Sequence, residues 1–356
     1  MKAKIITTVT FLCLLLLIPS VLGEVNLANS KDWQDVYSVM LYSELQGDAG
    51  FYLTDSSLAT IQKTLPSDSE IDAYSSDDAY ISNIERQLGS VGYEVSQNQE
   101  EDDMNIALDP GTGNYVVVSA SNYRSVGFLA PYAVKNDAWV FIVDDDNIDD
   151  VQDSISDADD VTAVGQFPRS QRDALSPYFD EWVNTGTSFT DSLEIAKKSG
   201  STKSVLLTDG TFLEHDIFAT DSPVLLTGSN KIPEPVYEYL EDNDIREVVI
   251  VGNHLSVVGE QIREKSRKEI SVFIKFGQSK TDSTGKIYGL SLFPLPALEI
   301  ELDVDKVLYS PVSEELIVYY ENEGNAGLYF LSTSVSIKQD GSEIGEVQDE
   351  EVTYLG

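Results

Sequence analysis

The sequence predicts an α/β protein of three similar parallel-sheet repeats, followed by a small all-β module. The first observation behind this prediction is a recurrent apolar strand ending in Thr or Asp, whose central residues Leu53, Ile142 and Leu226 are almost equally spaced. A second strand follows each copy after an acidic or polar stretch that resembles a helix. The strands of the three copies occupy residues 51–55 with 71–74, 140–144 with 161–165, and 224–228 with 248–252. A shared period of this length is typical of a repeat architecture.

The second observation is that uniformly apolar strands alternate with helical patterns throughout the three copies. This arrangement favours a parallel sheet with helices on both faces. The expected repeats cover residues 24–110, 111–200 and 201–295. The first contains a weak strand at 25–27 and helices at 32–41, with Asp32 as its cap, 57–65 and 77–88. The second contains strands at 115–118, 139–143 and 161–165 with helices at 124–134, 148–155 and 170–183. The third contains segments at 204–208, 212–219, 223–227, 233–240, 247–252 and 257–267.

The third observation is a change of pattern near Pro296, after which apolar and polar residues alternate with period two. The alternation covers residues 298–304, 316–320 and 334–338, and Asp340-Gly341 is a strong hairpin turn before 343–347. Residues 296–356 are therefore predicted to form a small β-sandwich module.

The N-terminus has the order of features found in a secretory signal. Lys2 and Lys4 precede the apolar run 5–18, and Pro19 and Gly23 follow it. An uncleaved membrane anchor is the alternative, but the run is short for a membrane span. We expect residues 1–23 to be a signal peptide and the protein to be secreted. Cys13, the only cysteine, falls within this segment, so the mature chain must be stable without disulfides.

A family resemblance is clearest in the third repeat. The segment Ser222–Gly228 (SPVLLTG), the helix 233–240 and the strand 245–252 (IREVVIVG) together resemble the type 2 cell-wall-binding repeat. The second repeat matches more loosely and the first is the most diverged, so the resemblance covers about residues 24–275. Asn253-His254 stands where the family has a second glycine, and the Arg-containing start motif of its repeats is not evident.

The resemblance implies three Rossmann-like lobes around a pseudo-threefold axis. It also implies non-covalent attachment to anionic or neutral envelope polymers through the clefts between the lobes. The terminal β-module resembles the adhesion-type sandwiches of long surface proteins. These features suggest a cell-surface protein similar to those of S-layers.

The net charge of −38 restricts the partners of the protein. Such a surface repels nucleic acid phosphates and anionic lipid headgroups. It is compatible with a salty medium, with bound divalent cations or with a crowded cell surface. The partners that the resemblance implies are envelope polysaccharide or other surface-layer proteins, and no membrane span is expected in the mature chain.

The acidic run 144–150 is a candidate cation site. Asp144, Asp146 and Asp149 place oxygen ligands at a strand end, where they would suit calcium. The run lacks the glycine and the terminal glutamate of an EF-hand loop, and the alternative is that it caps the following helix. No other cofactor is predicted.

The candidate ligand-binding residues lie at the carboxyl ends of the predicted strands, where open α/β sheets bind ligands. Aromatic rings follow the first strand of each repeat, and short polar side chains end several strands. The set is Trp33, Asp55, Tyr123, Asp144, Asp209, Phe212 and Thr227. The alternative for the three rings is that each covers the top of its own sheet.

The sequence carries no strong catalytic motif. Gly111-Thr112-Gly113 precedes a strand and is a turn, and no GxSxG elbow is present. The two histidines, His215 and His254, are more consistent with packing or surface roles than with catalysis. We therefore predict a non-enzymatic envelope protein; the alternative is an envelope-associated hydrolase that uses the acidic loops.

Overall fold

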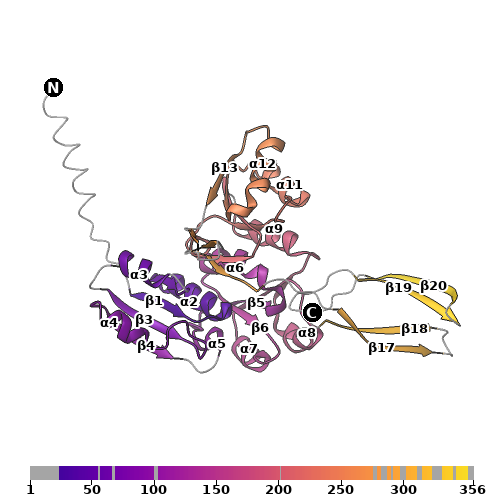
Figure 1. Cartoon of the computed structure of the whole chain (residues 1–356), viewed down its shortest axis with the longest axis horizontal. Coiled ribbons are helices and arrows are strands. Elements are labelled where there is room, and N and C mark those ends of the chain that lie inside the picture. Colours follow the sequence, from indigo (N-terminus) through magenta and orange to yellow (C-terminus); the bar gives the residue numbers. More distant parts are fainter. Residues whose placement is uncertain are drawn as a thin grey trace.

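A computed structural model describes most of the chain after the N-terminal segment. The described residues are 24–351 apart from 55–56, 66–68, 100–102, 201, 276–278, 282–286, 290–291, 297–301, 311–314, 323–330 and 340–341. The signal-peptide prediction and the Asp340-Gly341 turn lie outside this part. Figure 1 shows three α/β lobes in chain order and two β-hairpins that project from them.

The three lobes each contain a four-stranded parallel sheet, so the predicted fold class is confirmed. The first lobe comprises β1 (Val25–Asn29), α2 (Trp33–Gln46), β2 (Ala49–Tyr52), α3 (Leu58–Thr64), β3 (Glu70–Ser75), α4 (Ile84–Gly89) and β4 (Glu94–Gln99). The short helix α5 (Met104–Ala107) leads into the second lobe.

The second lobe repeats the pattern with some additional helical turns. It comprises β5 (Asn114–Ser119), η1 (Ala120–Ser125), α6 (Val126–Lys135), β6 (Trp139–Val143), α7 (Ile148–Ile155), β7 (Asp160–Val164), α8 (Arg169–Leu175), η2 (Ser176–Tyr178) and β8 (Glu181–Val183), followed by α9 (Ser188–Lys198).

The third lobe has the same strands with a shorter first connection. It comprises β9 (Ser204–Thr208), β10 (Phe212–Glu214), α10 (His215–Phe218), β11 (Val224–Leu226), α11 (Glu234–Asp242), β12 (Glu247–Val251), η3 (Asn253–Leu255), α12 (Ser256–Lys265) and β13 (Ser271–Lys275). The sheets run β2-β1-β3-β4, β6-β5-β7-β8 and β11-β9-β12-β13, so the order second, first, third, fourth is the same in every lobe.

The lobes meet at a junction of three equivalent helices. Helices α2, α6 and α10 each follow the first strand of a lobe, and each packs against the other two. Tyr37 of α2 lies 5.3 Å from Phe218 of α10, measured between ring centroids, and Trp33 lies 6.1 Å from Tyr123. One core cluster contains buried residues of all three lobes, whereas the first and third lobes each keep a second cluster of their own.

The strand β16 (Leu292–Pro294) returns to this junction from the C-terminal side. It pairs antiparallel with β10, and Leu295 N–H donates to Thr211 O at 3.0 Å. Tyr123 of the second lobe donates its hydroxyl to Pro296 O at 3.0 Å. Tyr52 of the first lobe packs edge-on against Phe293 with centroids 5.8 Å apart. Residues 292–296 therefore contact all three lobes, and we call them the strap.

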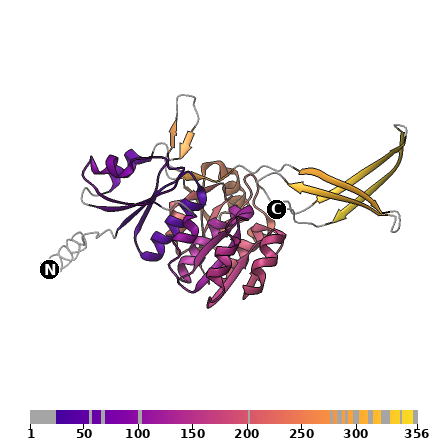
Figure 2. The same ribbon diagram turned by 90° about the horizontal axis from the view of Figure 1, so that it is seen from below.

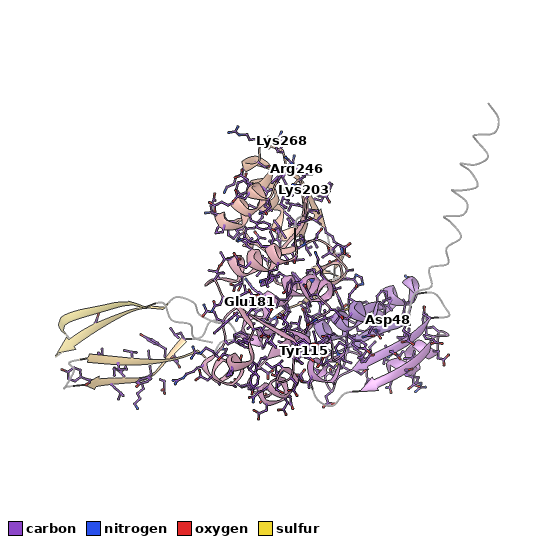
Figure 3. All side chains as sticks on the ribbon, turned by 180° about the vertical axis from the view of Figure 1, so that it is seen from behind. Asp48, Tyr115, Glu181, Lys203, Arg246 and Lys268 are labelled. Carbon is purple, nitrogen blue, oxygen red and sulfur yellow. The ribbon has the colours of Figure 1, made fainter. Side chains whose placement is uncertain are left out.

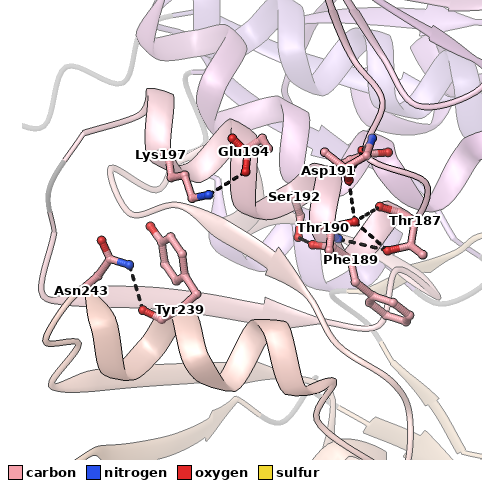
Figure 4. A network of polar contacts seen from close by, with 10 residues as sticks. Thr187, Phe189, Thr190, Asp191, Ser192, Glu194, Lys197, Tyr239 and Asn243 are labelled. Carbon is pink, nitrogen blue, oxygen red and sulfur yellow. Dashed lines mark hydrogen bonds and ion pairs between the residues drawn. The ribbon is translucent and has the colours of Figure 1, made fainter.

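Side-chain caps set the start of several helices. Asp32 caps α2 by accepting from Gln34 N–H, as the sequence predicts. Thr187 caps α9 in the same way through Thr190 N–H, within the polar network of Figure 4. Because α9 packs on both α6 and β11, this cap fixes the passage from the second lobe to the third.

Two predicted helices are shorter than expected. The helix predicted at 77–88 begins only at Ile84, because Asn29 exchanges hydrogen bonds with the backbone of Ile81 and holds the preceding loop open. The helix predicted at 170–183 ends at Leu175, and residues 181–183 form the edge strand β8. Pro177 lacks the N–H that continues a helix.

The C-terminal segment is all-β, as predicted, and forms separate hairpins in the described residues. β17 (Leu302–Ser310) pairs with β18 (Glu315–Asn322), and β19 (Leu331–Gln339) pairs with β20 (Ser342–Glu351). β14 (Ser279–Thr281) and β15 (Ile287–Gly289) form a smaller hairpin near the third lobe. The first two hairpins extend away from the lobes in two perpendicular views (Figures 1 and 2). Side chains of β17 are exposed rather than enclosed in a sandwich.

The junction makes a prediction about stability. Phe218 is 1% exposed at the centre of the three lobes, so Phe218→Ala should lower the free energy of unfolding by about 3–5 kcal/mol. Phe273→Ala, at a site that is 55% exposed, is the matched control and should cost less than about 1 kcal/mol. Urea denaturation of both variants measures the difference, and equal losses would contradict the role of the junction.

Candidate functional site

An acidic pocket lies where the carboxyl ends of strands in the first and second lobes meet. Its volume is about 740 Å³. The first lobe contributes the start of α2 and the loop after β3, and the second contributes α5 and the loop after β6. The lining residues are Asp32, Gln34, Asp35, Ser76, Asp77, Asp78, Asp103, Ile106, Ala107, Asp144, Asp146, Asn147 and Asp150.

Hydrogen bonds to backbone and side-chain groups position the carboxylates of the second lobe. Asp144 Oδ1 accepts from the N–H groups of Asp146 and Asn147 at 3.0 and 3.1 Å. Asn147 donates its amide to Asp103 Oδ2 at 2.6 Å, and Asp103 also caps α5 through Asn105 N–H. The same wall of the pocket therefore holds Asp103 and Asp144 in fixed positions.

Burial and mutual repulsion perturb the carboxylates of the first lobe. Burial, with the charges of Asp32 and Asp103, raises the pKa of Asp35 to about 6, although Ser30 Oγ donates to its carboxylate at 2.7 Å. Burial also raises the pKa of Asp32 and that of Asp103. Lys31 pairs with Asp78 at 2.5 Å beside the pocket. The cations labelled in Figure 3, Lys203, Arg246 and Lys268, lie instead at the outer end of the third lobe.

At the carboxyl edge of every sheet, a side-chain hydrogen bond links the first strand to the third, and we call this link a clamp. In each lobe, a side chain at or after the end of the first strand reaches the loop after the third strand. Asn29 donates to Ser75 Oγ at 2.9 Å, and Asn122 donates to Gln166 O. In the third lobe, Asp209 takes this place.

Glycine after the third strand leaves room for two of these clamps. A Cβ on Gly165 would lie 3.2 Å from the Asn122 amide nitrogen, and one on Gly252 would lie 2.7 Å from His254 Cε1. Both glycines also have positive φ angles, of 81° and 117°.

The clamp of the third lobe is charged. Asp209 is 3% exposed and accepts from the Thr211 hydroxyl at 2.6 Å, the Ser229 hydroxyl at 2.9 Å and His254 Nε2 at 2.9 Å. Burial pushes the pKa of Asp209 upward, but the hydrogen bonds of Thr211, His254 and Ser229 outweigh burial and hold the pKa below its usual value. The Asp209 carboxylate thus forms its hydrogen bonds with side chains of its own lobe.

The predicted aromatic site residues lie in or beside the lobe contacts. Tyr123 is buried at 3% exposure and bonded to the strap, so the exposed ring expected for ligand stacking is not what the structure shows. Trp33 is partly buried against Tyr123. Phe212 begins β10 and packs edge-on against His254 at 6.1 Å.

The predicted polar site residues have different surroundings. Asp144 lines the acidic pocket, whereas Thr227 is buried at the end of β11, where its N–H donates to Thr208 O. Asp209 belongs to the clamp of the third lobe. Asp55 lies outside the described residues.

The predicted metal ligands do not converge. Asp144 and Asp146 line the acidic pocket, but Asp149 does not. In the described part of the chain, no three His, Cys, Asp or Glu side chains form a group that could hold a metal ion. Asp144 Oδ1 instead accepts from the backbone of its own loop. No side chain caps α7, whose N-cap residue is Asn147, so only the charges of Asp149 and Asp150 in its first turn fit the capping alternative.

Sequence reasoning did not identify Asp35 and Asp103 as members of a common site. Asp103 ends an acidic run that suggests a linker between repeats, and Asp35 lies within a predicted helix. The sequence signal that could have indicated this site is that Asp35 and Asp103 both lie at the start of a helix, near the end of a strand. Only the packing of the first lobe on the second brings them together.

Comparisons with known proteins support the fold. No protein-family model matches the chain, and no curated protein matches its sequence. Among solved structures, Cwp8 from Clostridium difficile aligns with a TM-score of 0.54 at 14% identity over 69% of this chain. The aligned part is 47% of Cwp8, so the chain spans less than half of that protein. Cwp6 from Clostridium difficile aligns with a TM-score of 0.46 at 12% identity, over 64% of this chain and 40% of Cwp6.

No helix in the described part of the chain is both long enough and apolar enough to cross a lipid bilayer.

The raised pKa of Asp35 predicts a pH effect on stability. Because the folded pKa of about 6 exceeds the unfolded value of 3.8, this group stabilises the fold fully below about pH 4, and the contribution is lost as the pH rises through 6. Asp35→Asn keeps the acceptor for Ser30 and removes the charge, so its melting temperature should fall less than that of the wild type between pH 4 and 6. If the melting temperatures of wild type and variant fall by the same amount between pH 4 and 6, this expectation is refuted.

The charged clamp predicts the opposite sign. Asp209→Asn removes the charge and replaces one of the two buried oxygens that accept from Thr211, Ser229 and His254 with an NH2 donor, so it should destabilise the chain by about 1–3 kcal/mol at neutral pH. Since the pKa of Asp209 is lowered in the fold, the difference from wild type should shrink as the pH falls. Asp221→Asn, at an exposed carboxylate of the same lobe, is the control for thermal denaturation. A loss of the same size in the control would contradict the clamp.

Proposed function

We propose that this chain is a non-enzymatic cell-surface protein that attaches to envelope polysaccharide through the acidic pocket between its first two lobes. The observation that carries the proposal is the pocket itself, in which two lobes bring short polar side chains together at the carboxyl ends of their strands. The resemblance of the repeats to the type 2 cell-wall-binding family and the fold shared with Cwp8 are consistent with it.

The lining of the pocket determines the chemistry of its ligand. Carboxylates such as those of Asp77 and Asp146 accept hydrogen bonds from hydroxyl groups, and Gln34 adds an amide group. A bare polyanion would be repelled by so many aspartates. A neutral polysaccharide, or one bridged by divalent cations, fits better, and secretion and assembly with other surface proteins belong to the same proposal.

A pull-down with insoluble envelope polysaccharide, washed free of protein, tests this function. The double variant Asp77→Asn/Asp146→Asn alters two exposed pocket residues and should reduce the bound fraction about tenfold or more, because several hydroxyl contacts are lost. Parallel arms with calcium and with a chelator separate direct binding from cation bridging.

The matched control is Asp149→Asn/Asp153→Asn, which removes the same charge from exposed positions of α7 that do not line the pocket. This control should bind like the wild type. If both double variants lose binding equally, net charge rather than the pocket controls attachment. If the wild type itself does not bind, the function is wrong.

A second candidate function is an envelope hydrolase that uses acidic loop residues. One observation favours it: Asp35, with its pKa raised to about 6, lies in a cleft among other carboxylates, as a general acid would. Against it, the His254 and Ser229 side chains both donate to the same carboxylate oxygen, Asp209 Oδ2, so no serine–histidine–aspartate relay is formed. Release of reducing ends during the pull-down, abolished by Asp35→Asn, would favour the hydrolase.

A further inference from the structure

The second lobe exposes one large aromatic side chain. Trp182, the central residue of the edge strand β8, is 39% exposed, and no other large hydrophobic side chain of that lobe is exposed in the described part of the chain. The other two tryptophans differ from it, since Trp139 is fully buried and Trp33 is partly buried at the lobe contacts. Trp182 is therefore the tryptophan that a ligand can reach most readily.

The ring of Trp182 is held in one position. Its Nε1–H donates to Gly165 O at 2.8 Å, which ties the ring to the end of β7. Phe167 and Phe179 each lie 6.0 Å from it and 5.6 Å from each other, measured between ring centroids. These three distances form a nearly equilateral triangle, so both phenylalanines lie on one side of the indole and its exposed part lies away from them. A ligand that stacks on a ring fixed in this way loses little side-chain entropy.

Two side-chain amides lie near the ring in the chain. Gln166 and Asn184 follow β7 and β8 at the carboxyl edge of the sheet. Their amide groups form no hydrogen bond with another residue in the described part of the chain. They are therefore available to donate to a ligand and to accept from it.

The two carboxylates next to Trp182 in the chain already have partners. Asp180 Oδ2 accepts from Val161 N–H at 2.9 Å, and Glu181 pairs with Lys198 at 2.6 Å. The surroundings of the ring thus differ from the acidic pocket, whose lining contains eight aspartates and no aromatic ring.

A sugar ring fits an exposed indole with amide neighbours. The C–H groups of a pyranose pack against an aromatic ring, and its hydroxyl groups bond to side-chain amides. A protein partner fits less well, because a specific protein interface buries about 800 Å² on each side. The described part of the second lobe has no further exposed large apolar side chain to contribute to such an area.

Trp182 and the acidic pocket lie at the same edge of one sheet. The indole bonds to the residue that follows β7, while Asp144 and Asp146 follow β6, so both features are at the carboxyl edge, where open α/β sheets bind ligands. β6 and β8 are the two edge strands of this sheet, about 14 Å apart at the usual strand spacing. A polysaccharide of several sugar units can therefore contact both.

We propose that Trp182 is a stacking platform for one sugar ring of a neutral polysaccharide, flanked by the amides of Gln166 and Asn184. The platform adds a second subsite to the attachment proposed for the acidic pocket, and in that respect it rests on the proposed function. The two subsites share no residue, so each can be altered without changing the other.

A pull-down of the full chain over a series of concentrations of the washed envelope polysaccharide tests the platform. Trp182→Ala should raise the apparent dissociation constant about tenfold, because the stacking surface is lost. Trp182→Phe should keep most of the binding, because a flat ring remains. A structural role alone would weaken both variants alike, since each loses the hydrogen bond to Gly165 O.

The matched control is Phe273→Ala, which removes an exposed aromatic ring from β13, the edge strand at the same place in the third sheet. This control should bind like the wild type. Unchanged binding in Trp182→Ala, or an equal loss in Phe273→Ala, would overturn the proposal.

Acrylamide quenching of tryptophan fluorescence keeps the test decisive if Trp182→Ala fails to fold. The probe is a mixture of soluble oligosaccharides released from the same polysaccharide. In the wild type these should protect Trp182, the most exposed of the three tryptophans, from acrylamide. In Trp182→Phe they should leave the remaining quenching unchanged. No protection in the wild type, or the same protection in the variant, would contradict stacking on Trp182.

The outcomes distinguish this proposal from the proposed function. Loss of binding in Asp77→Asn/Asp146→Asn but not in Trp182→Ala would leave the acidic pocket as the attachment site and refute the platform. The reverse result would support the platform and refute the pocket. A wild type that does not bind the polysaccharide would refute both.

Discussion

The burial of three equivalent helices against one another is the constraint on which the rest of this structure depends. A parallel sheet has two apolar faces, and both must be covered. The first and third lobes each cover one face with a core cluster of their own, while a single common cluster spans all three lobes. Because α2, α6 and α10 fill that common space, their packing also fixes where the strand ends of neighbouring lobes meet.

The acidic pocket is a direct result of this packing. It opens where the carboxyl ends of the first two sheets face each other, so residues distant in sequence, such as Asp35 and Asp103, influence each other's charge. Their repulsion opposes the apolar contacts that hold the lobes together. Burial is the largest cause of the upward pKa shifts of Asp32 and Asp103, and the charge of Asp144 adds to it, so protonation of a carboxyl group relieves both effects.

Sequence patterns predicted those strands and helix ends that depend on local sequence. The strand at 139–143 and the Asp32 cap of α2 follow directly from apolar runs and capping residues, and the repeat spacing gave three parallel sheets. The loop at 76–83 and the edge strand β8 could not be predicted in this way, because the first depends on Asn29 and the second on Pro177 and tertiary pairing.

The candidate site was less predictable for the same reason. Strand ends can be located by pattern, but only the fold shows that Asp209 is enclosed by its neighbours while Asp144 borders an open pocket. Burial of Tyr123 depends on the strap, which is distant in sequence.

The strap also affects the order in which parts of the chain fold. Tyr123 and Pro296 are 173 residues apart, and Tyr52 and Leu213, which also share a hydrogen bond, are 161 apart. Contacts over such separations form late, since a long loop must close before they are made. As the chain leaves the ribosome, the first two lobes exist for a time with their common side uncovered. During that time the uncovered side of the first two lobes can associate with other chains, and this exposure ends when the last α/β segments emerge and cover it.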